Sequence, residues 1–127
     1  MYGIFVNDDG PVKYAEAIVS GRKPVETRSR NMLGSLYGQR VAIIQTGKGK
    51  RPTIIGYATI TAAWHYPKEY MNNIRQHTLI PAGSKFDSDN RGKWCYWMSW
   101  PEKCAPYELP ETAVRHGRSW CEFQMDF

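Results

Sequence analysis

The chain is poor in the residues that build disulfide frameworks and metal sites. Its three cysteines, Cys95, Cys104 and Cys121, are odd in number, and no two of them have CxxC spacing. A disulfide scaffold or a zinc knuckle is therefore not expected. The three histidines have no metal-ligand or catalytic spacing with the cysteines or the carboxylates, so we expect no metal site and no cofactor.

Long apolar runs, repeats and linkers are missing as well. No segment approaches the roughly 18 consecutive apolar residues of a membrane helix, and residues 1–9 contain acids where a secretory signal has cations. The 127 residues match the length of one ordinary domain. We therefore expect a single domain over residues 1–127 that is cytoplasmic and does not enter a membrane, and the oligomeric state stays open.

Acidic residues are scarce in one segment, where the basic residues stand out. Residues 20–51 contain eight basic residues and one acid, while the rest of the chain contains nine basic residues and eleven acids. The eight are Arg22, Lys23, Arg28, Arg30, Arg40, Lys48, Lys50 and Arg51. This asymmetry is typical of proteins that bind an anionic partner, most often nucleic acid, but a solvated basic face also produces it.

The apolar periodicity predicts an α+β fold. Strands are expected at Tyr2–Val6, Arg40–Thr46, Thr53–His65, Lys93–Trp100 and Ser119–Met125, an extended segment at Pro24–Ser29, and helices at Pro11–Ser20 and Pro67–His77. The first helix would be capped by Asp9 or Gly10. The two strands at 40–46 and 53–65 should pair as a hairpin. Short strands with an inserted helix favour a small, curved β-barrel flanked by two or more short helices, with an OB-type barrel as the rival.

The extended segment carries alternating charges. Period-two alternation places Glu26, Arg28 and Arg30 on one face, and the residues between them on the other, where Val25 and Thr27 would face the core. Arg28 has the paired donors that bind a phosphate or a base edge. It also lies where it can simply neutralise Glu26.

Lys23 precedes a proline, so the alternation does not determine its direction, and it is free to join Glu26. A close lysine–carboxylate pair in a partly dry cleft suits acid/base or ligand-orienting roles. The same pair also serves as a structural ion pair at the corner between helix and strand. Both interpretations stay open on the residues alone.

The turn between the two hairpin strands is basic and contains glycine. Its residues Lys48, Lys50 and Arg51 can follow a phosphate backbone without reading sequence, or form a solvated tip. The turn is not a nucleotide-binding P-loop, because the Gly-x4-Gly-Lys-Ser/Thr spacing is missing.

The segment KWCYWMSW is the aromatic part of the chain. Alternation puts Trp94, Tyr96, Met98 and Trp100 on one face and Cys95, Trp97 and Ser99 on the other. One set must lie in the core. The other, which includes Trp97, is a candidate platform for stacking unpaired bases.

Several of these motifs occur in the order of a known family. The matching features are Tyr14 and Gly21, the K-x-x-E-x-R motif of Lys23, Glu26 and Arg28, the segments Gly38–Ile43 and Ile55–Ile60, the aromatic strand with Trp97 followed by a proline-containing loop, and the Gly-to-Trp turn His116–Cys121. Together they resemble the ASCH domain family (activating signal cointegrator homology), a branch of the PUA-like β-barrels. The resemblance covers most of the chain.

The resemblance implies a cleft between the first helix and the mouth of the barrel. It would be lined by Tyr14, Lys23, Glu26 and Arg28, and we add Arg22, Arg30, Lys48, Lys50, Arg51 and Trp97 as nucleic-acid-binding candidates around it. Family members are mostly inferred to bind RNA, so RNA or a modified nucleoside is the expected partner.

An enzymatic alternative also follows from the resemblance. Some bacterial relatives hydrolyse N4-acetylcytidine, with a lysine that matches Lys23 and a threonine at the position of Glu26. A small hydrolase acting on a modified nucleoside or on RNA, with Lys23 and Glu26 as catalytic residues, is therefore the second hypothesis. A protein-interaction module has little support in the sequence.

Overall fold

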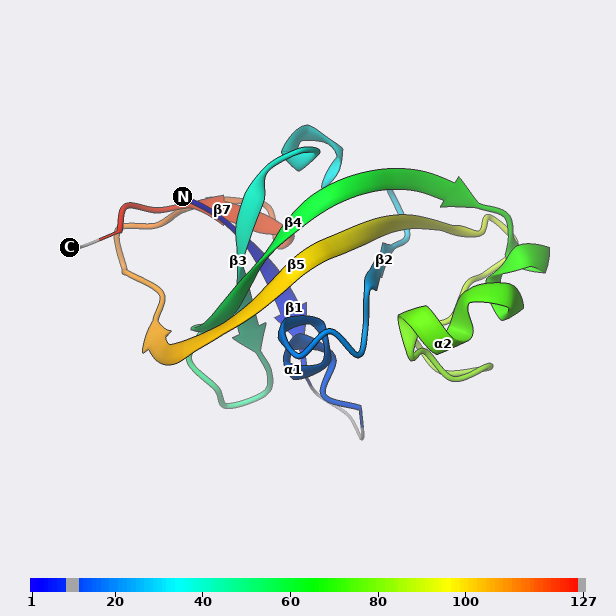
Figure 1. The fold of residues 1–127 in the computed structure, drawn as a ribbon, viewed down its shortest axis with the longest axis horizontal. Helices are drawn as coiled ribbons and strands as arrows, with labels where there is room; N and C mark the ends of the chain where they lie inside the picture. The colour runs from blue at the N-terminus through cyan, green and yellow to red at the C-terminus, as the bar shows by residue number, and fades with distance from the viewer. Residues whose placement is uncertain (9–11, 126–127) are drawn as a thin grey trace.

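The computed structural model describes residues 1–8 and 12–125 and shows a mixed seven-stranded sheet with two short α-helices (Figure 1). The strands are β1 (Tyr2–Asn7), β2 (Val25–Arg28), β3 (Arg40–Thr46), β4 (Thr53–Tyr66), β5 (Lys93–Glu108), β6 (Val114–His116) and β7 (Trp120–Glu122). The helices are α1 (Tyr14–Val19) and α2 (Arg75–Thr78), with 3-10 helices η1 (Gly34–Leu36) and η2 (Lys68–Ile74). The α+β class is confirmed.

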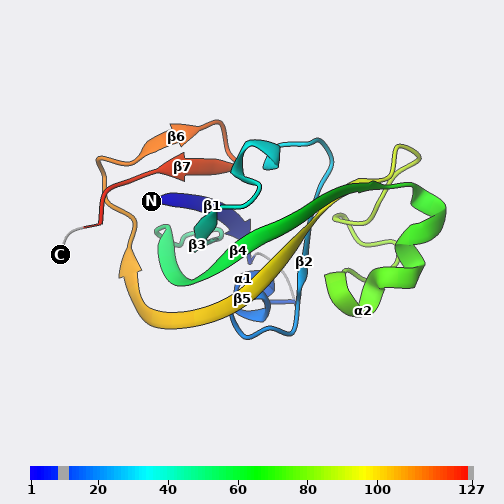
Figure 2. The ribbon, with the colours of Figure 1, turned by 45° about the horizontal axis from the view of Figure 1, so that its top comes forward.

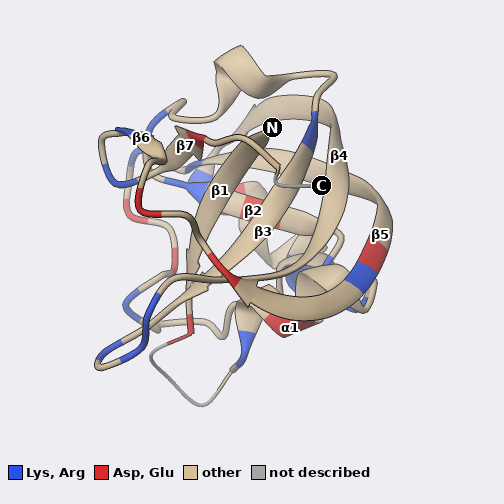
Figure 3. Ribbon diagram, turned by 90° about the vertical axis from the view of Figure 1, so that its left-hand side faces the viewer, with Lys and Arg blue, Asp and Glu red and all other residues tan. Residues whose placement is uncertain are grey.

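The strand order is β2-β5-β4-β3-β1-β7-β6, in which only β1 and β3 are parallel. Irregular pairing between the long strands β4 and β5 bends the sheet, which curls in the views of Figures 2 and 3. Among the described residues no pairing joins β2 to β6, so the sheet stays open and the expected barrel is not confirmed. A side chain connects β2 to the end of β1 across the open side of the sheet. Nη2 of Arg28 in β2 donates a hydrogen bond to the carbonyl of Phe5 in β1, 2.7 Å away.

Most expected elements are present with shifted ends. The hairpin of β3 and β4 is confirmed, and Val25–Arg28 is a strand. The helix expected at 67–77 is a 3-10 helix followed by one turn of α-helix. The prediction of a proline-containing loop after Trp100 is wrong, because strand β5 continues through this segment to Glu108. β6 was not anticipated, since its short exposed segment has no apolar alternation.

The helix α1 begins later than the sequence predicts. The expected start at Pro11 and the expected caps Asp9 and Gly10 lie outside the described residues. The carboxylate of Asp8 accepts a hydrogen bond from the backbone N–H of Ala15 at 2.9 Å, which satisfies one of the free donors of the first turn.

The helix packs closely on β4, where Gly56 leaves room for it. A Cβ atom there would clash with the backbone carbonyl of Glu102 in β5 and would lie 2.6 Å from Cγ1 of Val19 in α1.

The predicted alternation of β5 is confirmed between residues 94 and 98. Tyr96 and Met98 are buried in the main core, where α1 packs on the sheet, whereas Cys95 is buried on the other face in a smaller cluster with Val25. Trp100 leaves the pattern, because its backbone is in the left-handed region and its side chain is exposed. Among the described residues, no helix is long and apolar enough to cross a membrane.

Candidate functional site

A cleft of about 490 Å³ lies where the curled sheet stays open between β1 and β2. Its walls come from the end of β1 (residues 5–7), from β2, from α1, from the loop between α2 and β5, and from the β6–β7 hairpin. This volume lies within the range of roughly 300–1,000 Å³ that is usual for small-molecule sites. We call it the β1–β2 cleft.

Strand β2 presents the charged motif to this cleft. Val25 is completely buried against the smaller cluster, as expected, and the alternation sends Glu26 and Arg28 to the cleft. Thr27 is buried, again as expected, but it also contributes to the cleft wall because β2 is an outer strand of the sheet.

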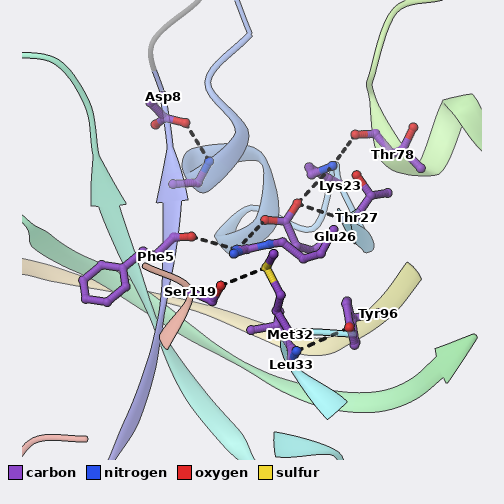
Figure 4. Close-up of polar contacts among 12 residues, drawn as sticks. Phe5, Asp8, Lys23, Glu26, Thr27, Met32, Leu33, Thr78, Tyr96 and Ser119 are labelled. Carbon is purple, nitrogen blue, oxygen red and sulfur yellow. Dashed lines mark hydrogen bonds and ion pairs between the residues drawn. The ribbon is translucent and has the colours of Figure 1, made fainter. Parts of the chain in front are cut away.

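Lys23, Glu26 and Arg28 form one ion-pair cluster in the lining of the cleft. Figure 4 shows Lys23 between Glu26 and Thr78. Nζ of Lys23 lies 3.6 Å from Oε1 of Glu26, and Nη2 of Arg28 lies 3.1 Å from Oε2. The Lys23 side chain is 1% exposed, and its ammonium also donates a hydrogen bond to the carbonyl of Thr78. The backbone N–H of Thr27 donates to Oε1 of Glu26 at 3.1 Å. The carboxylate is therefore held on both oxygens.

The environment shifts the pKa of both members of the buried pair. Burial lowers the pKa of Lys23, and the neighbouring Glu26 carboxylate offsets this only in part. Burial alone would raise the pKa of Glu26, but the charges of Arg28 and Lys23 and the hydrogen bonds outweigh it, so the pKa is lower than usual. Glu26 therefore stays ionised at neutral pH.

An aromatic wall lies beside this cluster. Nζ of Lys23 lies 4.9 Å from the centre of the Tyr14 ring, a cation–π contact. The ring of Phe86 meets Tyr14 edge-on, with centroids 5.7 Å apart, and both side chains line the cleft. Burial, together with the Glu26 charge, raises the pKa of Tyr14, so its hydroxyl stays protonated.

Three further cations line the cleft: Lys93, Arg115 and Arg118. Lys93 donates to the hydroxyl of Ser29 at 3.5 Å, and the guanidinium of Arg115 lies 4.8 Å from the centre of the Phe5 ring. None of the three forms an ion pair with any carboxylate of residues 1–8 or 12–125. Sequence reasoning did not name them as site residues because they lie far along the chain from the basic segment. Arg118 lies in the turn His116–Cys121 and Lys93 begins the segment KWCYWMSW, but no local pattern in either segment marks these cations as part of the cleft.

The other sequence candidates do not line the cleft. Arg22 and Arg30 are exposed, and Arg51 pairs with Glu108 on the surface. Lys48 and Lys50 lie in the turn after β3, whose last residue Thr46 reaches the cleft wall.

Trp97 also lies outside the cleft. It packs on the smaller hydrophobic cluster, and its ring centre is 5.6 Å from that of His77. In the described part of the chain, no group of three or more His, Cys, Asp or Glu is placed to hold a metal ion.

Comparisons with known proteins show what this fold is similar to. A crystal structure of ASCH from Zymomonas mobilis superposes with a TM-score of 0.70 and 20% identity, over 85% of this chain and 73% of that one. The structure of one of its mutant proteins superposes with a TM-score of 0.74 and 18% identity, over 96% of this chain and 88% of that one. The structure of a second mutant protein gives a TM-score of 0.64 and 21% identity, over 85% of this chain and 75% of that one. No family model and no curated protein matches the chain. The fold is therefore ASCH-like, as the sequence motifs predicted.

Proposed function

We propose that this ASCH-like protein binds RNA or a nucleotide-like ligand in the β1–β2 cleft. The observation that carries the proposal is the charge of the cleft lining, in which the described residues contribute five cationic side chains and one carboxylate, that of Glu26. A cleft lined by one sign of charge concentrates ligands of the other sign.

The ion pairs that Lys23 and Arg28 form with Glu26 do not cancel the positive charge of the cleft lining. Glu26 is already neutralised by Lys23 and Arg28, so Lys93, which is buried, and Arg115 and Arg118, which are exposed, add further positive charge to the cleft lining. Arginine is well suited to phosphate, because its planar donors bind two oxygens at once.

The lining also supports recognition of a base. Tyr14, Phe86 and Met32 provide an apolar wall beside the cations, and an unpaired base can lie against it while its phosphate meets the arginines. The ASCH-like fold supports the same interpretation, because RNA binding is what the sequence resemblance implies.

The test is the salt dependence of RNA binding. Fluorescently labelled octauridylate should bind the full chain with an affinity that falls steeply between about 50 and 200 mM salt, and Arg118→Ala should reduce the log–log slope by about one unit. Lys103→Ala is the matched control, since Lys103 is an exposed cation outside the cleft lining. An affinity that does not change with salt, or an equal effect of both variants, would contradict the proposal.

A hydrolase is the second candidate, and the lowered pKa of Lys23 is the observation that favours it. A lysine whose pKa is lowered by burial gives up its proton more readily than an exposed lysine, which is the direction that acid/base chemistry requires, and Glu26 would orient it. The ionised, fully engaged carboxylate of Glu26 is a poor proton acceptor, which is why binding is the first proposal.

Turnover separates the two functions. If the protein hydrolyses N4-acetylcytidine or short RNA, Glu26→Gln should lose about 10²-fold or more of the turnover rate while it holds substrate about as tightly. If no substrate in a panel of acylated nucleosides and short RNAs is consumed, the hydrolase hypothesis is discarded.

A further inference from the structure

The β6–β7 hairpin forms one rim of the β1–β2 cleft and carries an aromatic stack beside two cations. Figure 2 shows β7 next to β1, with β6 outside it. Arg115 and Arg118 of this hairpin line the cleft, and the imidazole of His116 lies between them in sequence. The turn contains Gly117 at φ +64°, a conformation that suits glycine.

His116 is held in one orientation although it is on the surface. Its ring stacks on the indole of Trp120 with centroids 4.0 Å apart and planes 13° from parallel, and its Nε2 lies 3.5 Å from Oε1 of Glu122. Trp120 is itself supported by an edge contact with Tyr2 at 5.8 Å. The side chain of His116 remains 39% exposed, while the Trp120 indole covers one of its two ring faces.

The hairpin is also fastened to the cleft wall. The hydroxyl of Ser119 donates to the sulfur of Met32 at 3.0 Å (Figure 4), and the backbone N–H of Phe5 donates to the carbonyl of Ser119 at 3.0 Å. Met32 and Phe5 both line the cleft. These contacts therefore hold the His116–Trp120 stack in a defined position relative to the β1–β2 cleft.

We infer that the exposed face of His116 is a second base-stacking site, which binds the nucleotide next to the one in the β1–β2 cleft. This inference rests on the proposed function and adds that the ligand is a single-stranded RNA longer than one nucleotide. A base on His116 extends an existing π-stack, and histidine is among the side chains that stack on unpaired RNA bases. Because the ring is already oriented, little side-chain entropy is lost on binding.

The charged residues of the β6–β7 hairpin suit an RNA strand that runs from the β1–β2 cleft to His116. Arg118 lies in the turn directly after β6 and lines the cleft, so it is the cation placed to bind the phosphate between the two nucleotides. Arg115 also lines the cleft, but it contacts Phe5 on the face of β6 opposite to that of His116. Glu122, the acid in contact with the stack, touches the imidazole edge and leaves the outer ring face open to the base. An extended single strand is required, because paired bases have no free face to offer His116.

The experiment compares a short and a long ligand on the full chain. Affinities of uridine monophosphate and octauridylate are measured for wild type, His116→Ala and His116→Tyr, with His65→Ala as an exposed histidine that lies outside the cleft lining. His116→Ala should weaken octauridylate binding about fivefold or more, the low end of base stacking on an aromatic side chain. Uridine monophosphate binding should change less than twofold, and His116→Tyr and His65→Ala should leave both ligands within twofold of wild type.

Crosslinking provides a measurement on the unmodified protein. Octauridylate with bromouridine, irradiated on wild type, should crosslink to His116 itself, assigned at single-residue level, in addition to cleft residues, because its neighbours Arg115 and Arg118 line the cleft. The inference is overturned if crosslinks map to the cleft alone, or if His116→Ala weakens both ligands equally or neither. If octauridylate binds and Arg118→Ala weakens it while His116→Ala does not, the cleft proposal stands and the stacking site falls. If wild type binds no octauridylate, both fall.

Discussion

Replacing Glu26 by leucine should destabilise the protein far more than its single ion pair with Lys23 suggests. The Lys23 and Glu26 side chains are 1% and 9% exposed, and Glu26 also pairs with Arg28. Removing one partner of a buried pair leaves the other charge without compensation, which costs about 3–5 kcal/mol of unfolding free energy. This loss of unfolding free energy is limited, because Lys23 can give up its proton instead of remaining buried as an unpaired charge, and burial already lowers its pKa.

The double replacement Lys23→Met with Glu26→Leu tests this reasoning. Exchanging a buried ion pair for apolar side chains of similar volume is often neutral or stabilising, so the double variant should recover most of the stability that Glu26→Leu loses. It should remain somewhat less stable than wild type, because Arg28 loses its partner in every variant that lacks Glu26. The coupling between the two positions, measured by urea unfolding at neutral pH, should reach about 2 kcal/mol.

An exposed pair at the same separation is the matched control. Arg51 and Glu108 also lie 3.6 Å apart, but their side chains are 78% and 65% exposed. Glu108→Leu should change stability by no more than the roughly 0–1 kcal/mol that exposed ion pairs contribute. The reasoning is refuted if Glu26→Leu costs as little as Glu108→Leu, or if the losses at Lys23 and Glu26 simply add.

Three further outcomes are expected. Because the pKa of Glu26 is lower in the fold than its ordinary value, its ionised form stabilises the native state at neutral pH, and this contribution disappears as the pH falls through the lowered pKa. Urea unfolding from pH 7 down to about pH 3 should therefore show a larger loss for wild type than for Glu26→Gln, and equal losses would contradict the assignment. Trp97→Ala should lower the free energy of unfolding by about 2 kcal/mol, which is less than the roughly 3–5 kcal/mol expected for a fully buried aromatic, because Trp97 is half-buried. Unchanged thermal stability with weakened RNA binding would identify Trp97 as a stacking residue instead. Gly56→Ala should cost about 1–3 kcal/mol or more, since the added Cβ would clash with the backbone carbonyl of Glu102 in β5 as well as with Val19 of α1, and a melting temperature equal to wild type would show that both elements can move aside.

The sequence alone determined the local part of the site. Lys23, Glu26 and Arg28 lie within six residues, so strand alternation was enough to place Glu26 and Arg28 on one face and Val25 on the other. The alternation of residues 94–98 in β5 followed from the same period of two, but the sequence did not say which face lies in the core, and the structure buries Tyr96 on one face and Cys95 on the other. The hairpin of β3 and β4 was also visible, because two β-branched runs flank a turn that contains glycine.

Only the tertiary structure decided how the cleft is completed. Whether a curled sheet closes depends on the cumulative bend of its strands, and the bends of β4 and β5 arise from pairing irregularities that have no mark in the sequence. The gap left between β1 and β2 brings Lys93, Arg115 and Arg118 to a motif that lies 65 or more positions earlier in the chain. The basic segment that dominates the sequence supplies only Lys23 and Arg28 to the cleft, because charge counted along a chain does not record which side chains the fold turns to the same side.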